Sequence, residues 1–386
     1  WPDPLAPPTA THKNPHEQRS RQGTLLLGEP TSGVAYTDAS FPKIVISHEV
    51  LVGNLHPEQW SQIEPSVDDY CAILPYGTGN AYFLAHPYVK KDITDFLKQL
   101  CFRRQPFGPL EEGKMREEDE DEEANPDMDD LSVTVPVQAP GKDAKDRFGK
   151  PWPLFLARGS QRLREYLLHQ QTFAITPDLT FSVIPIDPTV CSWAICNFGG
   201  DSVTPNATGA ILEKVKVALW KNAKFCQHVD AVMAKHGIPG SAPQRVVRAT
   251  STFTVTIFNN RDAQGNPAPI AQLRGRPITT DHNDHQTYLR LIRRGKYWIG
   301  LNQLEINIGV DCQLCKADTH PTWDCPFHQT EGWYGPKYDG AERLEHRVKR
   351  AREAEEQVST NTRGGTSRGR GRRGGRGGSR GGNHGG

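Results

Sequence analysis

The segment Cys312-Gln-Leu-Cys-Lys-Ala-Asp-Thr-His-Pro-Thr-Trp-Asp-Cys325 decides the fold around it, because it sets three thiols and one imidazole at the spacing C-x2-C-x4-H-x4-C. The x2 spacing lets Cys312 and Cys315 hold a metal ion from one tight turn. The two x4 loops bring His320 and Cys325 to the other side of that ion. Thiolates and a neutral imidazole suit zinc. The sequence therefore predicts a Zn2+ site with these four ligands, in a knuckle over residues 309–330.

A bound ion would order this segment, which is too short to bury a hydrophobic core of its own. Two alternatives stay open. The three cysteines could lie near a histidine by chance, although the complete ligand spacing argues against this. His328 offers one more nitrogen and could compete as a ligand.

The C-terminal residues 359–386 are rich in arginine and glycine. Between residues 361 and 386 there are seven arginines and no acidic residue. Glycine leaves the backbone mobile, so each guanidinium can stack on a base or bind a phosphate. We expect a disordered RGG-rich tail that binds single-stranded nucleic acid with little sequence preference. The candidate nucleic-acid contacts in this tail are Arg363, Arg368, Arg370, Arg372, Arg373, Arg376 and Arg380.

An acidic segment offsets the basic tail, so the net charge of the chain is only +1. Residues 111–130 carry twelve acidic and two basic side chains. We interpret residues 106–147, which lack a hydrophobic pattern, as an acidic linker. The alternative is that the acidic segment folds back onto the tail of the same chain and inhibits it.

The composition argues against secretion and membrane insertion. The 386 residues contain no run of 18 apolar residues, and no apolar signal segment follows the N-terminus. The sequence begins at Trp1 rather than at Met, which leaves open whether its N-terminus is complete. The five cysteines outside the zinc motif are scattered, which indicates a reducing compartment rather than a disulfide framework. The expected location is intracellular, in the cytoplasm, the nucleus or both.

The N-terminal third divides into two predicted parts. Residues 1–40 are rich in Pro, Thr, Ser and His without periodicity, which predicts a mostly disordered arm. Residues 41–105 are predicted to form a small α+β unit, with strands at 42–47 and 81–85 and a helix at 92–100.

Residues 148–308 are predicted to form a second α+β unit. Its expected elements, in chain order, are strand 191–198, helix 207–236, strands 250–258 and 270–273, a helix capped by Asp284, and strand 303–308, with an extra strand at 181–185. The order β-α-β-β-α-β is that of the ferredoxin-like sandwich, the fold of RNA-recognition motifs. The two aromatic motifs that stack bases in typical members are not recognisable, so base stacking on this sheet is not predicted.

Two further features concern charge. Residues 341–358 are predicted to form a charged helix supported by Glu–Arg pairs one turn apart. Basic residues also gather in the second unit, where they form either a nucleic-acid surface beside the knuckle or an ordinary charged helix face. They are Arg245, Arg248, Arg274, Arg276, Arg290, Arg293, Arg294 and Lys296.

No arrangement of paired acids, no activated nucleophile and no nucleotide-binding loop points to an enzyme. The cluster Asp281-His-Asn-Asp-His285 could form a metal or acid–base site, but we interpret it as a helix-capping turn. We therefore expect neither catalysis nor a small-molecule substrate.

The motif at 312–325 resembles the retroviral-type CCHC zinc knuckle. Trp323 lies two residues before the last cysteine, where that family often places an aromatic residue that stacks on an unpaired base. Lys316 follows the second cysteine, where it can contact phosphate. The chain departs from the family pattern at Gln313, where an aromatic residue is usual, and at Lys316 and Thr319, where glycine is often found.

The order of a folded unit, an RNA-recognition-like unit, a CCHC knuckle and a basic tail resembles the Gag-like, first-reading-frame proteins of non-LTR retrotransposons, in particular those common in fungal genomes. The resemblance covers roughly residues 180–330. It implies binding of the element's own RNA, self-association into ribonucleoprotein particles and strand annealing. Reverse transcriptase and protease activities would belong to other chains.

The sequence thus predicts a non-enzymatic, zinc-containing protein that binds single-stranded RNA or DNA and can self-associate. The alternative is a host zinc-knuckle adaptor that binds protein partners through residues 42–105 and 190–308. Binding to nucleic acid would weaken steeply between about 50 and 200 mM salt, whereas a mostly apolar protein interface would not.

Overall fold

The computed structural model describes residues 1–7, 14–25, 29–30, 36–78, 80–100, 102, 131–141, 152–262, 264–306 and 310–336. Nearly all of them belong to one compact unit, Trp1–Asp262 with Pro267–Tyr338. The predicted helix at 341–358, the RGG-rich tail at 359–386 and most of the acidic linker at 106–147 lie outside the described residues. No helix among the described residues is long and apolar enough to cross a lipid bilayer.

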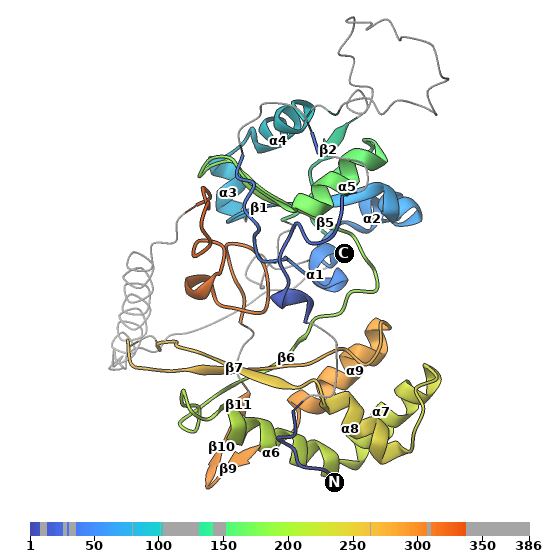
Figure 1. Ribbon diagram of the computed structural model, residues 1–386, viewed down its shortest axis with the longest axis vertical. Coiled ribbons are helices and arrows are strands. Elements are labelled where there is room, and N and C mark those ends of the chain that lie inside the picture. The colour runs from blue at the N-terminus through green and yellow to red at the C-terminus, as the bar shows by residue number, and fades with distance from the viewer. Residues whose placement is uncertain are drawn as a thin grey trace, which may run out of the picture. The chain divides into compact units, whose positions relative to one another are not determined.

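The first sheet has five antiparallel strands in the order β2-β3-β1-β5-β4 (Figure 1). The strands are β1 (Tyr70–Pro75), β2 (Ser132–Thr134), β3 (Leu154–Ala157), β4 (Thr172–Ala174) and β5 (Thr180–Pro185). The helices and 3-10 turns around it are η1 (Pro15–Glu17), α1 (His48–Val52), α2 (Pro57–Ile63), η2 (Glu64–Asp69), α3 (Asn80–Ala85), α4 (Val89–Lys98) and α5 (Gln161–Gln170).

Both faces of the first sheet are buried, which explains why its strands are apolar almost throughout. Ile73 and Leu156 belong to the core that includes residues of α4 and α5. The neighbouring residues Leu74 and Phe155 point to the other face, because side chains alternate along a strand. That second face packs against α1, α2 and the segment that carries the zinc motif.

The second sheet has four antiparallel strands in the order β11-β6-β8-β7. They are β6 (Ala194–Gly199), β7 (Thr254–Phe258), β8 (Ile270–Arg274) and β11 (Glu305–Ile306). A single core joins this sheet to the helices that accompany it in Figure 1. These helices are α6 (Thr208–Lys221), α7 (Ala223–Lys235), α8 (Ala242–Thr250) and α9 (His282–Arg293), and a short hairpin of β9 (Trp298–Ile299) and β10 (Asn302–Gln303) precedes the last strand.

The predicted fold class, α+β, is confirmed by helices packed on antiparallel sheets. The strands expected at 181–185, 191–198, 250–258 and 270–273 are present as β5, β6, β7 and β8. The local sequence was sufficient to find them, through clean alternation of side chains in the case of 250–258.

Four element predictions are corrected by the structure. The single helix expected at 207–236 is broken at Asn222, whose side chain accepts a hydrogen bond of 3.2 Å from the backbone N–H of Phe225 and so caps α7. Residues 81–85 are helical in α3 rather than a strand. Residues 42–47 belong to no named strand; Pro42 forms an isolated bridge with Arg19. The cap of α9 is Asp281 and not Asp284.

The predicted division between a unit at 41–105 and a unit at 148–308 is also wrong. Strand β1 pairs with β3 on one side and with β5 on the other, so residues from both predicted units build one sheet. The reason is that β1 carries apolar residues on both faces and has to be covered on both.

The predicted disordered arm at 1–40 is partly ordered. Asn14 and Ser20 are buried. The backbone N–H of Ser20 donates to the carbonyl of Phe41 at 2.8 Å, and that of Lys43 donates to Gln18 at 2.8 Å. These bonds tie the arm to the extended segment that packs on the first sheet.

Candidate metal centre

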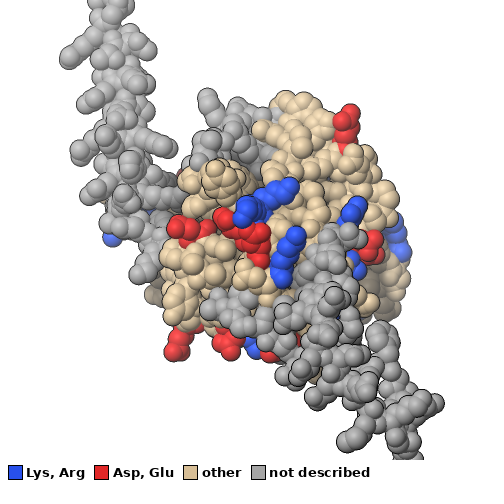
Figure 2. Space-filling model, turned by 90° about the horizontal axis from the view of Figure 1, so that it is seen from above, with Lys and Arg blue, Asp and Glu red and all other residues tan. Residues whose placement is uncertain are grey.

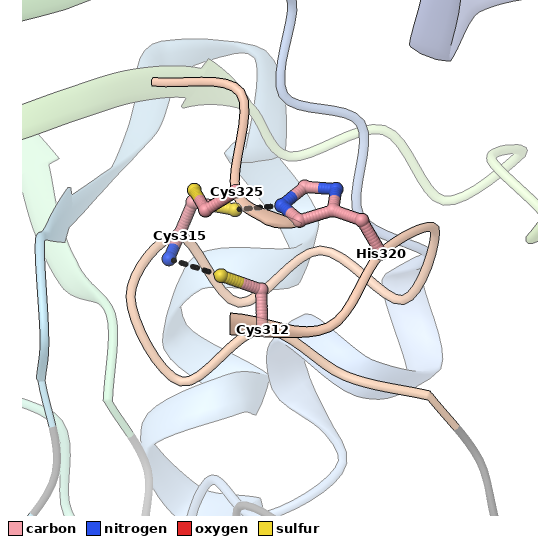
Figure 3. Close-up of side chains that lie close together, drawn as sticks. All are labelled: Cys312, Cys315, His320 and Cys325. Atoms are coloured by element: carbon pink, nitrogen blue, oxygen red, sulfur yellow. Dashed lines mark hydrogen bonds between the residues drawn. The ribbon is translucent and has the colours of Figure 1, made fainter. Parts of the chain in front are cut away.

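Cys312, Cys315, His320 and Cys325 come together in the structure, as their spacing predicts (Figure 3). One ligand atom of each lies within 4.8 Å of those of the other three, and all four residues form a buried cluster. The Cys315 sulfur lies 3.3 Å from Nε2 of His320. A tetrahedral ion bonded to sulfur at 2.3 Å would separate its sulfur ligands by about 3.8 Å, so the cluster matches such an ion.

Backbone hydrogen bonds shape the turn that carries the first two cysteines. The N–H of Cys312 donates to the carbonyl of Ala317, and the N–H of Lys316 donates to the carbonyl of Cys312, both at 2.9 Å. The N–H of Cys315 donates to the Cys312 sulfur at 3.4 Å. Lys316 adopts φ of +65°. This left-handed conformation favours glycine, which has no Cβ, over a lysine.

The second half of the motif is fixed through Thr322. The 3-10 turn η3 (Thr322–Asp324) leads directly into Cys325. The hydroxyl of Thr322 accepts a hydrogen bond of 2.8 Å from the backbone N–H of Gln313. This bond joins the two halves of the motif, so the ligands from both halves face one centre.

The protonation of the three thiols is uneven. Burial would raise the pKa of the Cys312 thiol, but hydrogen bonds from Cys315, Cys325 and His320 lower it instead. The pKa of Cys315 is raised, chiefly by burial. The pKa of Cys325 is raised, chiefly by its hydrogen bond to Cys312. Three thiolates buried this close together would repel one another unless a cation lay between them. A divalent metal ion would be such a cation.

The knuckle packs against the first sheet. Leu314 and Phe327 belong to the same core as Leu74 and Tyr76. The Phe327 ring lies 5.0 Å from that of Tyr76 and 6.0 Å from that of Phe41, measured between centroids. The carbonyl of Leu314 accepts a hydrogen bond of 2.8 Å from the N–H of Gly77. The metal centre is therefore part of a hydrophobic core and not a separate module.

The knuckle also contacts the second sheet, through polar bonds. Gln272 of β8 donates from its side-chain amide to the carbonyl of Asp318 at 2.9 Å. Arg274 of the same strand donates to the carbonyl of Thr319. Trp323 donates from its indole nitrogen to the carbonyl of Asn259 at 3.0 Å. The sequence analysis did not predict these contacts. The signal that could have indicated them is the pair of polar residues in β8, Gln272 and Arg274, which alternate with Ala271 and Leu273.

The two residues of the knuckle that were predicted to contact nucleic acid, Trp323 and Lys316, differ in their exposure. Trp323 is 37% exposed, so part of its ring is accessible. Lys316 is 3% exposed, and its ammonium donates to the carbonyl of Gln313 at 2.7 Å. A phosphate contact by Lys316 requires its side chain to leave this position. His328 does not belong to the cluster of four ligands. The seven tail arginines lie outside the described residues.

Several of the basic residues of the second unit stabilise the fold. Arg245 forms an ion pair of 2.6 Å with Asp230. Arg293 donates to the carbonyl of Ile195 at 2.8 Å, and Arg274 bonds the knuckle as described. On the face shown in Figure 2, the Lys and Arg side chains of the described residues are interspersed with Asp and Glu side chains. The internal contacts of Arg245, Arg274 and Arg293 favour the alternative of ordinary structural charges over a continuous nucleic-acid surface.

The cluster Asp281–His285 is a helix-capping turn, as interpreted. The Asp281 carboxylate accepts a hydrogen bond of 2.9 Å from the N–H of Asp284. This bond lowers the pKa of Asp281. His285 is a buried residue of α9 itself. Among the described residues, the one group of side chains close enough to hold a metal ion is that of Cys312, Cys315, His320 and Cys325, and it includes no residue of Asp281–His285.

Comparison of the chain with models of known protein families, with curated proteins and with solved structures finds no match. Its function has to be inferred from the cluster and from the residues around it.

Proposed function

We propose that this chain is a non-enzymatic, zinc-dependent protein that binds single-stranded nucleic acid, with RNA as the expected target. The observation that carries the proposal is the buried group of Cys312, Cys315, His320 and Cys325, whose ligand atoms lie within 4.8 Å of one another. Zinc is the metal that this donor set favours, since three thiolates and one imidazole form a common structural zinc site. The ion would fix the fold of the knuckle and would leave no open position for catalysis.

Nucleic-acid binding is supported by two features beside the metal. Trp323 follows His320 within the motif and keeps 37% of its surface exposed, and an exposed indole can stack on an unpaired base. The C-terminal segment 361–386 supplies seven arginines among glycines. Such a segment binds phosphates and bases with strong salt dependence.

The strand order of both sheets supports a ferredoxin-like fold for each of them. The elements β6-α6-β7-β8-α9-β11 follow the ferredoxin-like order, and their sheet order places β6 and β8 at the centre. The first sheet repeats this plan with β1-α4-β2-β3-α5-β5. We propose that both are RNA-recognition-like units in a Gag-like protein that self-associates into ribonucleoprotein particles.

A second candidate is a host adaptor that uses the knuckle to hold a protein-binding body together. Burial of Leu314, Lys316 and Phe327 favours this candidate, because these knuckle side chains pack into the body. The two candidates differ in salt dependence. Nucleic-acid affinity would fall at least tenfold between about 50 and 200 mM salt, whereas affinity for a protein partner through an apolar surface would change little.

The test is binding of a single-stranded RNA oligonucleotide by the full chain and by Cys312→Ser/Cys315→Ser, with metal content measured on the same samples. We expect zinc and most of the affinity to be lost together in the variant. Cys71→Ser is the matched control, because it removes a buried thiol that lies outside the cluster. A wild-type chain that holds zinc but binds no RNA would refute nucleic-acid binding and favour the adaptor.

A further inference from the structure

Two adjoining cavities lie in the compact unit, outside the metal centre. One has a volume of about 530 Å³ and the other of about 1080 Å³. Arg276, Pro277 and Ile278, which follow β8, line both cavities. Arg276 therefore stands at their junction, and we call the pair of cavities the Arg276 groove.

Backbone bonds fix the positions from which two side chains enter the groove. Trp193 precedes β6 and lines the smaller cavity. Its carbonyl accepts a hydrogen bond of 3.0 Å from the N–H of Gly275. The N–H of Arg276 donates to the hydroxyl of Thr252 at 2.9 Å. The indole and the guanidinium thus project from adjacent, hydrogen-bonded ends of β6 and β8.

The charge of the groove is positive. Lys43 lines the smaller cavity, Arg248 lines the larger one, and both are exposed, as is Arg276. None of these three cationic groups has a side-chain hydrogen bond or ion pair to another residue in the described part of the chain. The lining also includes one carboxylate, that of Asp187, whose Oδ1 accepts two bonds of 2.7 Å from Thr189, so the three cations outnumber the single acidic group.

We propose that the Arg276 groove binds a short segment of single-stranded RNA, with a base stacked on Trp193 and the adjoining phosphates held by Lys43 and Arg276. Free cations beside an aromatic ring form the usual surface for an unpaired strand. An acidic peptide would satisfy the cations but would leave Trp193 without a base to stack on. Trp1, which is 59% exposed, lines the larger cavity and offers a second aromatic face. This inference rests on the proposed function, because it assumes that the chain binds nucleic acid.

Photocrosslinking tests the location. The full chain is irradiated with a short oligouridine that carries 4-thiouridine, and the modified peptides are mapped by mass spectrometry. We expect adducts on Trp193 or within residues 276–280, in addition to adducts on the knuckle and the tail. Adducts confined to the knuckle and the tail would overturn the proposal.

Affinity measurements test the contacts. At about 50 mM salt, Lys43→Gln/Arg276→Gln is expected to weaken oligouridine binding about tenfold. Trp193→Ala is expected to weaken it at least about fivefold through lost stacking, and circular dichroism checks that this variant folds. The matched control is Lys90→Gln/Lys98→Gln, which removes two exposed cations of α4 that line neither cavity and should leave the affinity nearly unchanged.

The outcomes separate this inference from the proposed function. If the wild type binds oligouridine and the groove variants bind it equally well, the groove proposal is wrong and the proposed function stands. If the wild type binds no oligouridine at all, the proposed function fails and the groove proposal fails with it. The same measurements with oligothymidine show whether the groove distinguishes RNA from DNA.

Discussion

The side-chain amide of Gln272 donates a hydrogen bond of 2.9 Å to the carbonyl of Asp318, which lies two residues before the candidate metal ligand His320. The same nitrogen lies 3.1 Å from the Asn197 side-chain oxygen. Gln272 is fully buried in β8. A central strand of the second sheet therefore holds the loop between Cys315 and His320, the second and third residues of the candidate metal cluster.

Replacement of this amide should destabilise the protein. Gln272→Leu leaves the Asp318 carbonyl and the Asn197 oxygen without this donor, at a cost of about 2 kcal/mol. The measurement is the free energy of unfolding in denaturant. Gln161→Leu is the control, because Gln161 bonds Glu165 on the exposed face of α5 and should change stability little. Equal stability of the two variants would contradict the role of Gln272.

The reactivity of the cysteines should depend on the metal. Thiolates bound to a metal ion resist alkylation, so chelation should add three alkylated residues: Cys312, Cys315 and Cys325. Cys71 and Cys196 should stay unreactive while the fold persists, because burial raises their pKa to about 11 and about 12. Mass spectrometry after brief alkylation checks this. Modification of the three cluster cysteines at the same rate with and without chelator would argue against a bound metal.

The break between α6 and α7 should depend on its cap. Asn222→Ala removes the oxygen that accepts from Phe225, and loss of such a cap costs about 1 kcal/mol. Asn222→Ser keeps a hydroxyl at the same place and should retain most of the stability. Thermal or chemical unfolding of both variants tests this, and an alanine variant as stable as the serine variant would show that the cap contributes nothing.

His285 should make stability depend on pH. Burial, followed by the charges of His282 and Arg293, lowers its pKa to about 4. The unfolded chain binds a proton near the ordinary value of 6.5, so the folded state loses relative stability as the pH falls from about 6.5 to about 4. The loss from this residue is at most about 3 kcal/mol. His285→Leu should unfold with a shallower pH dependence across this interval, and a slope unchanged from the wild type would contradict the assignment.

The features that could be predicted from the sequence are those that depend on residues close together in the chain. The four candidate metal ligands lie within 14 residues, and the strands β6, β7 and β8 were located from their own residues. The contacts between the knuckle and the two sheets could not be predicted from local patterns. They join residues far apart in the chain, such as Gly77 with Leu314 and Gln272 with Asp318.

The errors have the same origin. The strand at residues 70–75 was not predicted, and nothing near it in the sequence indicates that its partners are residues 154–157 and 180–185. The pattern at 207–236 is helical throughout, and only the polar side chain of Asn222 marks the break. Lys316 looked accessible in the sequence, yet the turn that Cys312 and Cys315 require buries its side chain.

The most direct measurement is the metal content of the purified full chain by elemental mass spectrometry, compared with Cys312→Ser/Cys315→Ser. We predict one zinc ion per wild-type chain and almost none in the variant. A wild-type chain that is folded and contains no metal would contradict the central claim that Cys312, Cys315, His320 and Cys325 form a zinc site.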